Sequence, residues 1–259
     1  MSDCRSGLYL LLILALAGCA SAPQSEALLE QRPSQLAESR IIEGVPFYAQ
    51  ELYQCGPAAL ATILQFSEIE VSPDELVPLV YLPERKGSLQ IEMVAAARSY
   101  GRLTYEISPD METLLGEIAA GSPVLVMQNL ALSIYPRWHY AVVKGYDFSR
   151  QEVLLNSGIN EDYWLDFKVF ERTWSRADHW GILALEPGTM PVSADASQYF
   201  RALADLEPFS YVEALEDAYL SGLKRWPTDQ NLLMGYGNLL YTMERLKESA
   251  NQYQQVTKP

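Results

Sequence analysis

The stretch YAQELYQCGPAALATIL, residues 48–64, places a cysteine where a helix is expected to begin. Pro57 stands at a first-turn position and the apolar residues after it share one face, which predicts a short buried helix. A helix start directs free N–H groups and a partial positive charge at the side chain there, and both favour a thiolate. Cys55 is therefore a candidate nucleophile, and we expect its thiol pKa to lie well below the ordinary value of about 8.5.

A histidine and an asparagine stand where they could serve this thiol. His139 opens the segment HYAVVKGY, Asn156 lies near the end of EVLLNS, and a short turn over 147–150 joins these two expected strands as a hairpin. Counting back from the turn places Asn156 within about two residues of the position opposite His139, inside cross-strand side-chain reach. His139 could take up and return a proton, and Asn156 could hold the ring in one tautomer. Together with Cys55 they match the Cys-His-Asn arrangement of papain-like hydrolases.

Two glutamines compete for the oxyanion-binding role. Gln50, five residues before Cys55, could direct an amide N–H at the oxyanion beside the backbone N–H of Cys55, and Gln54 is the alternative. The second histidine, His179, has no such companions and is interpreted as structural. One cysteine and two histidines lack the number and spacing of ligands that a zinc site needs, so we expect no metal and no cofactor.

The order of the expected elements predicts an α+β domain over residues 41–188. Helices are expected first, and antiparallel strands follow. Beyond the helix at Cys55, the helices cover residues 89–101 and 111–121, and the strands cover residues 123–128, 139–146, 152–157 and 180–186.

The remainder of the chain is predicted to be helical. Residues 189–197 form a linker, and residues 198–259 carry no strand signal. Tyr219 and Tyr253 are 34 residues apart, and a period of about 34 residues is that of the tetratricopeptide repeat. Gly237 and Ser249 stand at small-residue positions of such a repeat. About one and a half repeats are visible, so we expect a small all-α domain that packs on the first domain or on a protein partner.

The N-terminus has the features of a lipoprotein signal. Residues 1–18 contain an apolar run too short to span a bilayer permanently, and they end in a segment, Leu16-Ala17-Gly18-Cys19, that resembles a lipobox. The resemblance implies lipidation of Cys19 and, because Ala20 follows, an outer-membrane location in a Gram-negative bacterium. Residues 19–40 are polar and are expected to form the lipidated end and a flexible tether. Cys55 would then be the only free thiol of the mature chain.

Several motifs together resemble the C39-like cysteine peptidases. They are Gln50-x4-Cys55-Gly56-Pro57, then WHYAVVKGYD from Trp138, then Leu155-Asn156, and the resemblance covers roughly residues 43–186. Exporter-linked members commonly have Asp-Pro where this chain has Asn156-Ser157, and their glutamine stands one residue further from the cysteine. The chain therefore resembles a different branch, and the leader-peptide substrate of the exporter-linked branch is not carried over.

The sequence predicts a membrane-anchored cysteine peptidase with Cys55, His139, Asn156 and Gln50 in its site, and with repeats that bind a protein. A first alternative is a cell-wall peptide hydrolase in the role of NlpC/P60 lipoproteins, which have an Asp-Cys-Ser-Gly type motif where this chain has Gln-Cys-Gly-Pro. A second is an inactive scaffold whose repeats are the functional part. The net charge of −14 argues against a nucleic-acid partner.

Overall fold

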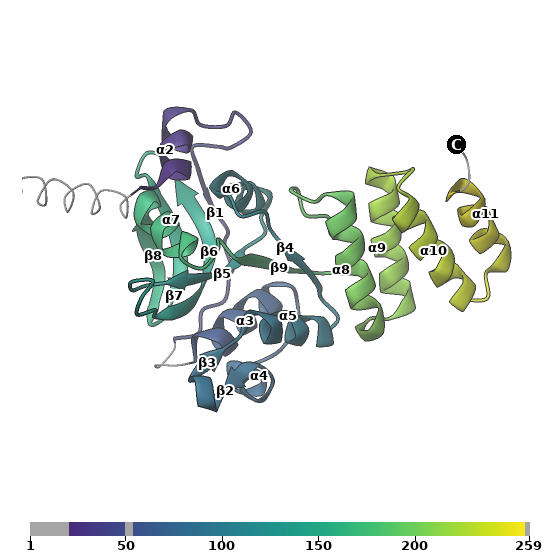
Figure 1. Ribbon diagram of the computed structural model, residues 1–259, viewed down its shortest axis with the longest axis horizontal. Helices are drawn as coiled ribbons and strands as arrows, with labels where there is room; N and C mark the ends of the chain where they lie inside the picture. The colour runs from purple at the N-terminus through teal and green to yellow at the C-terminus, as the bar shows by residue number, and fades with distance from the viewer. Residues whose placement is uncertain (1–20, 50–53, 257–259) are drawn as a thin grey trace, which may run out of the picture.

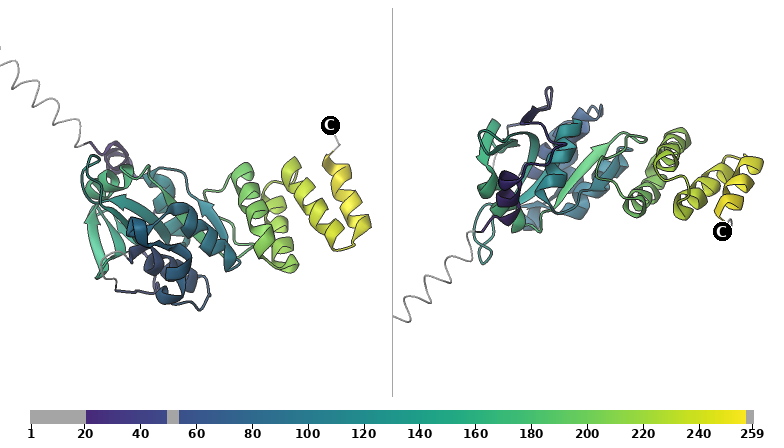
Figure 2. Two further views of the ribbon diagram at one scale, coloured as in Figure 1. Left: turned by 60° about the horizontal axis from the view of Figure 1, so that its bottom comes forward. Right: turned by 90° about the horizontal axis from the view of Figure 1, so that it is seen from above.

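The computed structural model describes residues 21–49 and 54–256. A body of helices and sheet is followed by a row of helices that extends from one side of it (Figures 1 and 2). The helices are α2 (Pro23–Glu30), α3 (Cys55–Phe66), α4 (Pro73–Val80), α5 (Gln90–Ser99), α6 (Met111–Ala120), α7 (Phe167–Ser175), α8 (Ala196–Leu206), α9 (Val212–Arg225), α10 (Gln230–Thr242) and α11 (Leu246–Val256). The strands are β1 (Ser39–Ile41), β2 (Tyr81–Leu82), β3 (Gly87–Ser88), β4 (Leu103–Glu106), β5 (Val124–Asn129), β6 (Trp138–Asp147), β7 (Glu152–Ser157), β8 (Asn160–Asp166) and β9 (Gly181–Leu185). The expected α+β class is confirmed.

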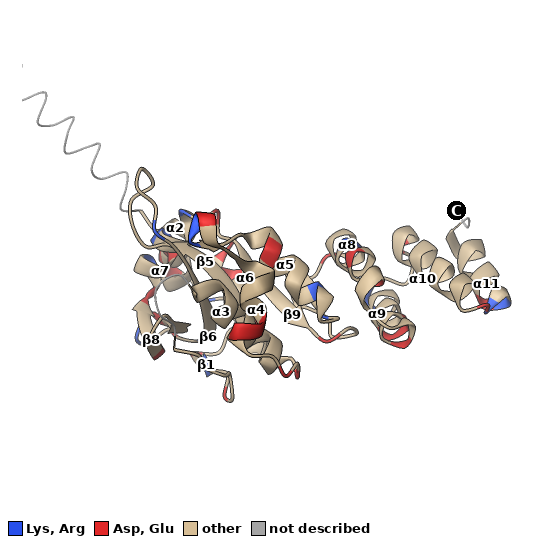
Figure 3. Cartoon of the chain, turned by 90° about the horizontal axis from the view of Figure 1, so that it is seen from below, with Lys and Arg blue, Asp and Glu red and all other residues tan. Residues whose placement is uncertain are grey.

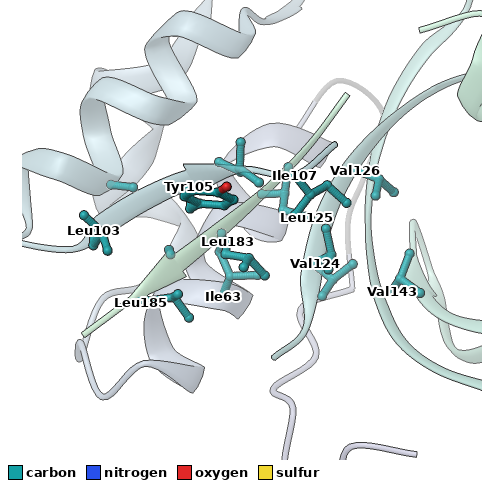
Figure 4. Close-up of a cluster of buried hydrophobic side chains, with 14 of the residues drawn as sticks. Ile63, Leu103, Tyr105, Ile107, Val124, Leu125, Val126, Val143, Leu183 and Leu185 are labelled. Carbon is teal, nitrogen blue, oxygen red and sulfur yellow. The ribbon is translucent and has the colours of Figure 1, made fainter. Parts of the chain in front are cut away.

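The main sheet runs in the order β4-β9-β5-β6-β7-β8, with β1 added to β6, and its pairings are antiparallel. Helix α3 packs on the sheet through the apolar face that its sequence predicts, and Leu60, Ile63 and Leu64 are almost fully buried there. Figure 4 shows Ile63 among buried side chains of the sheet, including Leu125 and Leu183. This packing fixes the helix that begins at Cys55 against the strands.

Strand β6 has different partners at its two ends. It pairs with β5 from Trp138 to Val143, and it pairs with β7 only from Val142 onward. A bulge at Lys144 adds one residue to β6 within the β7 pairing. Among the residues that the structure describes, none forms a strand paired to the β7-facing edge of β6 between residues 138 and 141, and we call this opening the fork.

The expected flexible tether over residues 19–40 is wrong for the part that the structure describes. Helix α2 lies in this segment and packs beside α6 and α7 (Figure 1). The buried carboxylate of Glu171 in α7 accepts hydrogen bonds from the backbone N–H groups of Gln24 (3.1 Å) and Ser25 (2.7 Å). These N–H groups belong to the first turn of α2, where intrahelical partners are missing, so the distant carboxylate caps the helix.

The C-terminal helices pack on one another and on the first domain. In α10, an added Cβ at Gly235 would lie 2.6 Å from the hydroxyl of Tyr219, and one at Gly237 would lie 2.6 Å from the ring of Tyr253. Glycines thus permit close contact with aromatic rings of α9 and α11. The hydroxyl of Tyr105 in β4 donates to Gln198 of α8 at 3.0 Å, which ties the first helix of the row to the sheet. Within residues 21–49 and 54–256, no helix is both long enough and apolar enough to cross a membrane.

Candidate active site

Cys55 is the first residue of α3 and is half-buried. The side chain of the N-cap residue, Gln54, does not cap the helix. Backbone N–H groups of Tyr140, Gly56 and Cys55 itself are directed at the thiol, and each favours its ionised form. The expected position of the cysteine at a helix N-terminus is therefore confirmed, and a strand contributes a third N–H group.

The contact with Tyr140 locates the thiol at the fork. The N–H of Leu130 donates to the carbonyl of Arg137 at 2.9 Å, so odd-numbered residues at this end of β6 direct their backbone groups toward β5. Tyr140, an even-numbered residue, directs its N–H to the other edge, from which β7 has already separated. Cys55 occupies this free edge, beside the residue that follows His139.

Burial raises the pKa of the Cys55 thiol above its ordinary value, because the three backbone hydrogen bonds offset the loss of water only in part. The sequence-based expectation of a lowered thiol pKa is thus not met in this structure. The helix-start effect is present, as expected, but desolvation of the half-enclosed sulfur outweighs it. At neutral pH the thiol is protonated.

His139 directs its ring across the fork toward β7. Its Nε2 atom lies 2.8 Å from Oγ of Ser157. Burial, together with the nearby positive charge of Arg137, lowers the pKa of His139 to about 4. The imidazole is therefore neutral at neutral pH. The thiol contacts the backbone N–H of Tyr140, and the imidazole belongs to the preceding residue of the same strand, so both groups lie at the fork.

Asn156 has other partners than His139. It lies opposite Val142, three residues along β6 from His139, so the expected offset of about two residues is wrong by one. The odd separation places Asn156 and His139 on opposite faces of the sheet. Asn156 is buried, and its Nδ2 donates to the carbonyl of Pro46 at 3.0 Å while its Oδ1 accepts from the N–H of Asp162 at 3.4 Å.

The model of the Peptidase C39 like family matches residues 42–181, more than half of the chain. The chain belongs to this family.

Similar solved structures include a C39-like peptidase from Bacillus anthracis, with 19% identity, a TM-score of 0.47, and coverage of 56% of this chain and 96% of that one. A double glycine motif protease from an AMS/PCAT transporter, solved with its leader peptide, has 20% identity and a TM-score of 0.41, with 56% and 96% covered. The peptidase domain of Streptococcus ComA, a bifunctional ABC transporter of a quorum-sensing pathway, has 21% identity and a TM-score of 0.41, with 54% and 96% covered. No curated protein matches the chain.

Of the two glutamines considered for the oxyanion in this C39-like domain, the structure describes only Gln54. Gln50 lies outside the described residues, so its role at the oxyanion stays a prediction. Gln54 directly precedes α3, is exposed, and gives no side-chain cap to the helix. Cys19 also lies outside the described residues, and its lipidation stays a prediction.

Ser88 and Ser157, to which the sequence analysis gave no role, lie close to residues of the fork in this C39-like domain. The hydroxyl of Tyr140 donates to the carbonyl of Ser88 in β3 at 3.2 Å. Gly56, directly after the nucleophile candidate, faces the same serine, and an added Cβ there would lie 2.2 Å from its Oγ. The short β2–β3 hairpin therefore packs against the start of α3. Ser157 could have been found from strand alternation, because it is the neighbour of Asn156 and so points to the opposite face.

His179 lies in a different environment. Its ring packs edge-on against Trp174, with centroids 4.9 Å apart. Burial lowers its pKa, although Glu171, Asp178 and Asp110 act in the opposite direction. Among the residues that the structure describes, no group of three or more His, Cys, Asp or Glu side chains could hold a metal ion.

Proposed function

We propose that this C39-like chain is a cysteine peptidase in which Cys55 is the nucleophile and His139 is the base and acid. The observation that carries the proposal is the placement of both side chains at the fork of β6 and β7, the thiol against the N–H of Tyr140 and the imidazole on the residue before it. The family match supports peptide-bond hydrolysis as the reaction.

The protonation states define how the reaction would begin. Thiol and imidazole are both neutral at pH 7, so the proton moves during attack rather than before it. With Nε2–H donating to Ser157, the lone pair of Nδ1 remains free to accept the thiol proton. As Sγ forms its bond to the substrate carbonyl carbon, the carbonyl π electrons move to oxygen and an imidazolium is formed.

The second half of the reaction returns the proton. The C–N bond breaks, the imidazolium proton passes to the leaving amine, and a thioester on Cys55 remains. Water, deprotonated by the neutral imidazole, then hydrolyses the thioester to a carboxylic acid and restores the thiol. The N–H groups at the start of α3 would stabilise the oxyanion in both halves, with Gln50 as the proposed side-chain donor.

We propose that the hydroxyl of Ser157 orients the imidazole, a role that the sequence assigns to Asn156. The distance of 2.8 Å from His139 supports this assignment. Asn156 instead binds Pro46, at the entrance of the segment that leads to Cys55, and so would position the nucleophile from the other side. In this proposal the pair Asn156-Ser157 serves both partners of the catalytic dyad.

Cys19 and the C-terminal helices suggest a location and a binding partner for the peptidase. We propose that Cys19 carries a lipid that holds the protein at the outer membrane, and that α8–α11 resemble tetratricopeptide repeats and bind a protein. The contacts of Gly237 with Tyr253 and of Ser249 with the carbonyl of Gly237 at 2.8 Å support a repeat-like packing.

A catalytically inactive binding protein is the second candidate. The neutral, desolvated state of Cys55 and His139 favours it, because a vestigial site also has no activated thiolate. A peptide vinyl sulfone library, read by intact mass, separates the two. A peptidase gives a covalent adduct on Cys55 that is lost in His139→Ala, whereas an inactive protein gives adducts at the same low rate in both.

A further inference from the structure

The hairpin tip between β5 and β6, residues 130–137, exposes a group of apolar side chains. Its sequence is LALSIYPR, with no charge before Arg137. The exposed fractions are 64% for Leu132, 90% for Ile134 and 83% for Tyr135. Side chains so exposed protrude from the body of the protein instead of lining a groove, so the tip lacks the concave form of a ligand pocket.

The tip is held in a defined conformation. Leu132 and Tyr135 form a bridge, and the N–H of Tyr135 donates to the carbonyl of Leu132 at 3.0 Å. The buried side chain of Asn129 closes its base, because Oδ1 accepts from the N–H groups of Ala131 (3.0 Å) and Arg137 (2.9 Å). The apolar side chains are therefore presented on a turn that is already formed, which lowers the entropy cost of binding.

One short stretch, from Glu171 in α7 to Arg176 directly after this helix, connects the tip to the N-terminal segment. Glu171 caps the first turn of α2, Thr173 accepts from Gln128 at 2.6 Å, and Arg176 donates to the carbonyl of Asn129 at 3.3 Å. From residue 171 to residue 176 a helix rises only about 7.5 Å. The base of the tip and the start of α2 are thus bound to the same few residues.

The expected lipid attachment site is near this stretch. Cys19 precedes Gln24 by five residues, a length that spans at most roughly 18 Å when fully extended. A lipid on Cys19 would therefore hold a bilayer surface within that distance of the start of α2. Helix α7 and the base of the hairpin tip would then lie on the membrane-facing side of the protein.

We propose that the β5–β6 hairpin tip inserts into the interfacial region of a lipid bilayer and forms a second membrane contact beside the lipid anchor. Leu132 and Ile134 supply apolar surface, Tyr135 supplies an aromatic ring with a polar end, and Arg137 stands at the depth of the phosphate groups. The net charge of −14 and the dispersed Lys and Arg residues in Figure 3 indicate that binding rests on apolar insertion and not on attraction to anionic lipid.

Vesicle flotation with the chain from Ala20 onward tests the proposal, because this chain retains the described structure without Cys19. The probe is zwitterionic phosphatidylethanolamine–phosphatidylcholine vesicles. We expect the wild type to bind. The double variant Ile134→Ser/Tyr135→Ser should bind at least about tenfold more weakly, because two exposed apolar side chains are lost. Ile91→Ser, at a site 71% exposed on α5, is the matched control and should bind as the wild type does.

Absence of wild-type binding, or equal binding by the double variant, would overturn the proposal. A double variant that binds vesicles normally but cleaves peptides poorly would also overturn it and assign the tip to substrate recognition. Because Cys55→Ala should bind vesicles as the wild type does, a failure of the proposed peptidase function leaves this measurement interpretable. Raising the salt concentration should leave binding unchanged.

Discussion

Nε2 of His139 and Oγ of Ser157 are 2.8 Å apart, across the point where β6 and β7 separate. A neutral imidazole has one N–H donor and one acceptor nitrogen, so the partner of Nε2 sets the tautomer. If Nε2–H donates to the serine hydroxyl, Nδ1 presents its lone pair to the site. Ser157 would then decide which nitrogen can act as the base.

Replacing Ser157 by alanine should remove this tautomer preference. The chain has only two histidines, so ¹⁵N NMR of the imidazole nitrogens gives two resolvable sets of signals, assigned through His179→Gln. We expect the Nε2–H tautomer of His139 in the wild type, a mixture in Ser157→Ala, and recovery in Ser157→Thr. An Nδ1–H tautomer in the wild type would contradict the assigned role.

Removal of Arg137 should raise the pKa of His139. Burial and the positive charge of Arg137 together lower this pKa to about 4, so a neutral residue at 137 makes the imidazolium less unfavourable. A pH titration of the ¹⁵N signals of His139 would measure this pKa in the wild type and in Arg137→Ala, with Arg137→Lys as the control that keeps the charge. The acid limb of any activity profile should move to higher pH with the alanine. An unchanged titration in Arg137→Ala would argue against an electrostatic effect.

Alkylation of Cys55 by iodoacetamide should be slow at neutral pH. Burial raises the thiol pKa, so the thiolate that reacts is formed only in alkaline solution. The second-order rate should continue to rise above pH 9, and His139→Ala should change it little at pH 7 because the wild-type imidazole is neutral. Fast labelling at pH 7 that requires His139 would instead reveal a preformed thiolate–imidazolium pair.

Asn156→Ala should destabilise the domain. The buried amide donates to the carbonyl of Pro46, and its loss leaves that carbonyl without this donor. We expect the free energy of unfolding in urea to fall by about 1–3 kcal/mol. Asn160→Ala, at an exposed position of β8, is the matched control and should lie close to the wild type. Equal stability of the two variants would show that the Pro46 contact contributes little.

Local pattern predicted the elements that carry the site. The helix at Cys55 begins where Pro57 and the apolar face place it, and the strand over 152–157 has the bounds that its composition indicates. The bulge at Lys144 was not predicted, because nothing in the spacing of HYAVVKGY marks an extra residue. Because of this error in register, Asn156 was expected to contact the imidazole of His139. A shift of one residue along β7 moves to the opposite face of the sheet, where Ser157 makes that contact.

Contacts distant in sequence account for the other differences. Helix α2 exists where a tether was expected because Glu171, 146 residues after Ser25, caps its first turn. Helix α7 has its own local signal, an N-cap at Asp166 followed by buried Phe167, Phe170 and Trp174, and this signal was overlooked between the expected strands. The thiol pKa depends on burial by the assembled fold, which no short motif can express.

The central claim is that Cys55 and His139 hydrolyse peptide bonds, and cleavage of a proteome-derived peptide library tests it most directly. New N-termini would be identified by mass spectrometry after incubation with the wild type, Cys55→Ala and His139→Ala, each shown to be folded by circular dichroism. The proposal predicts a set of new termini with the wild type that both variants lose. Equal products from the wild type and Cys55→Ala, or none from any of them, would contradict it.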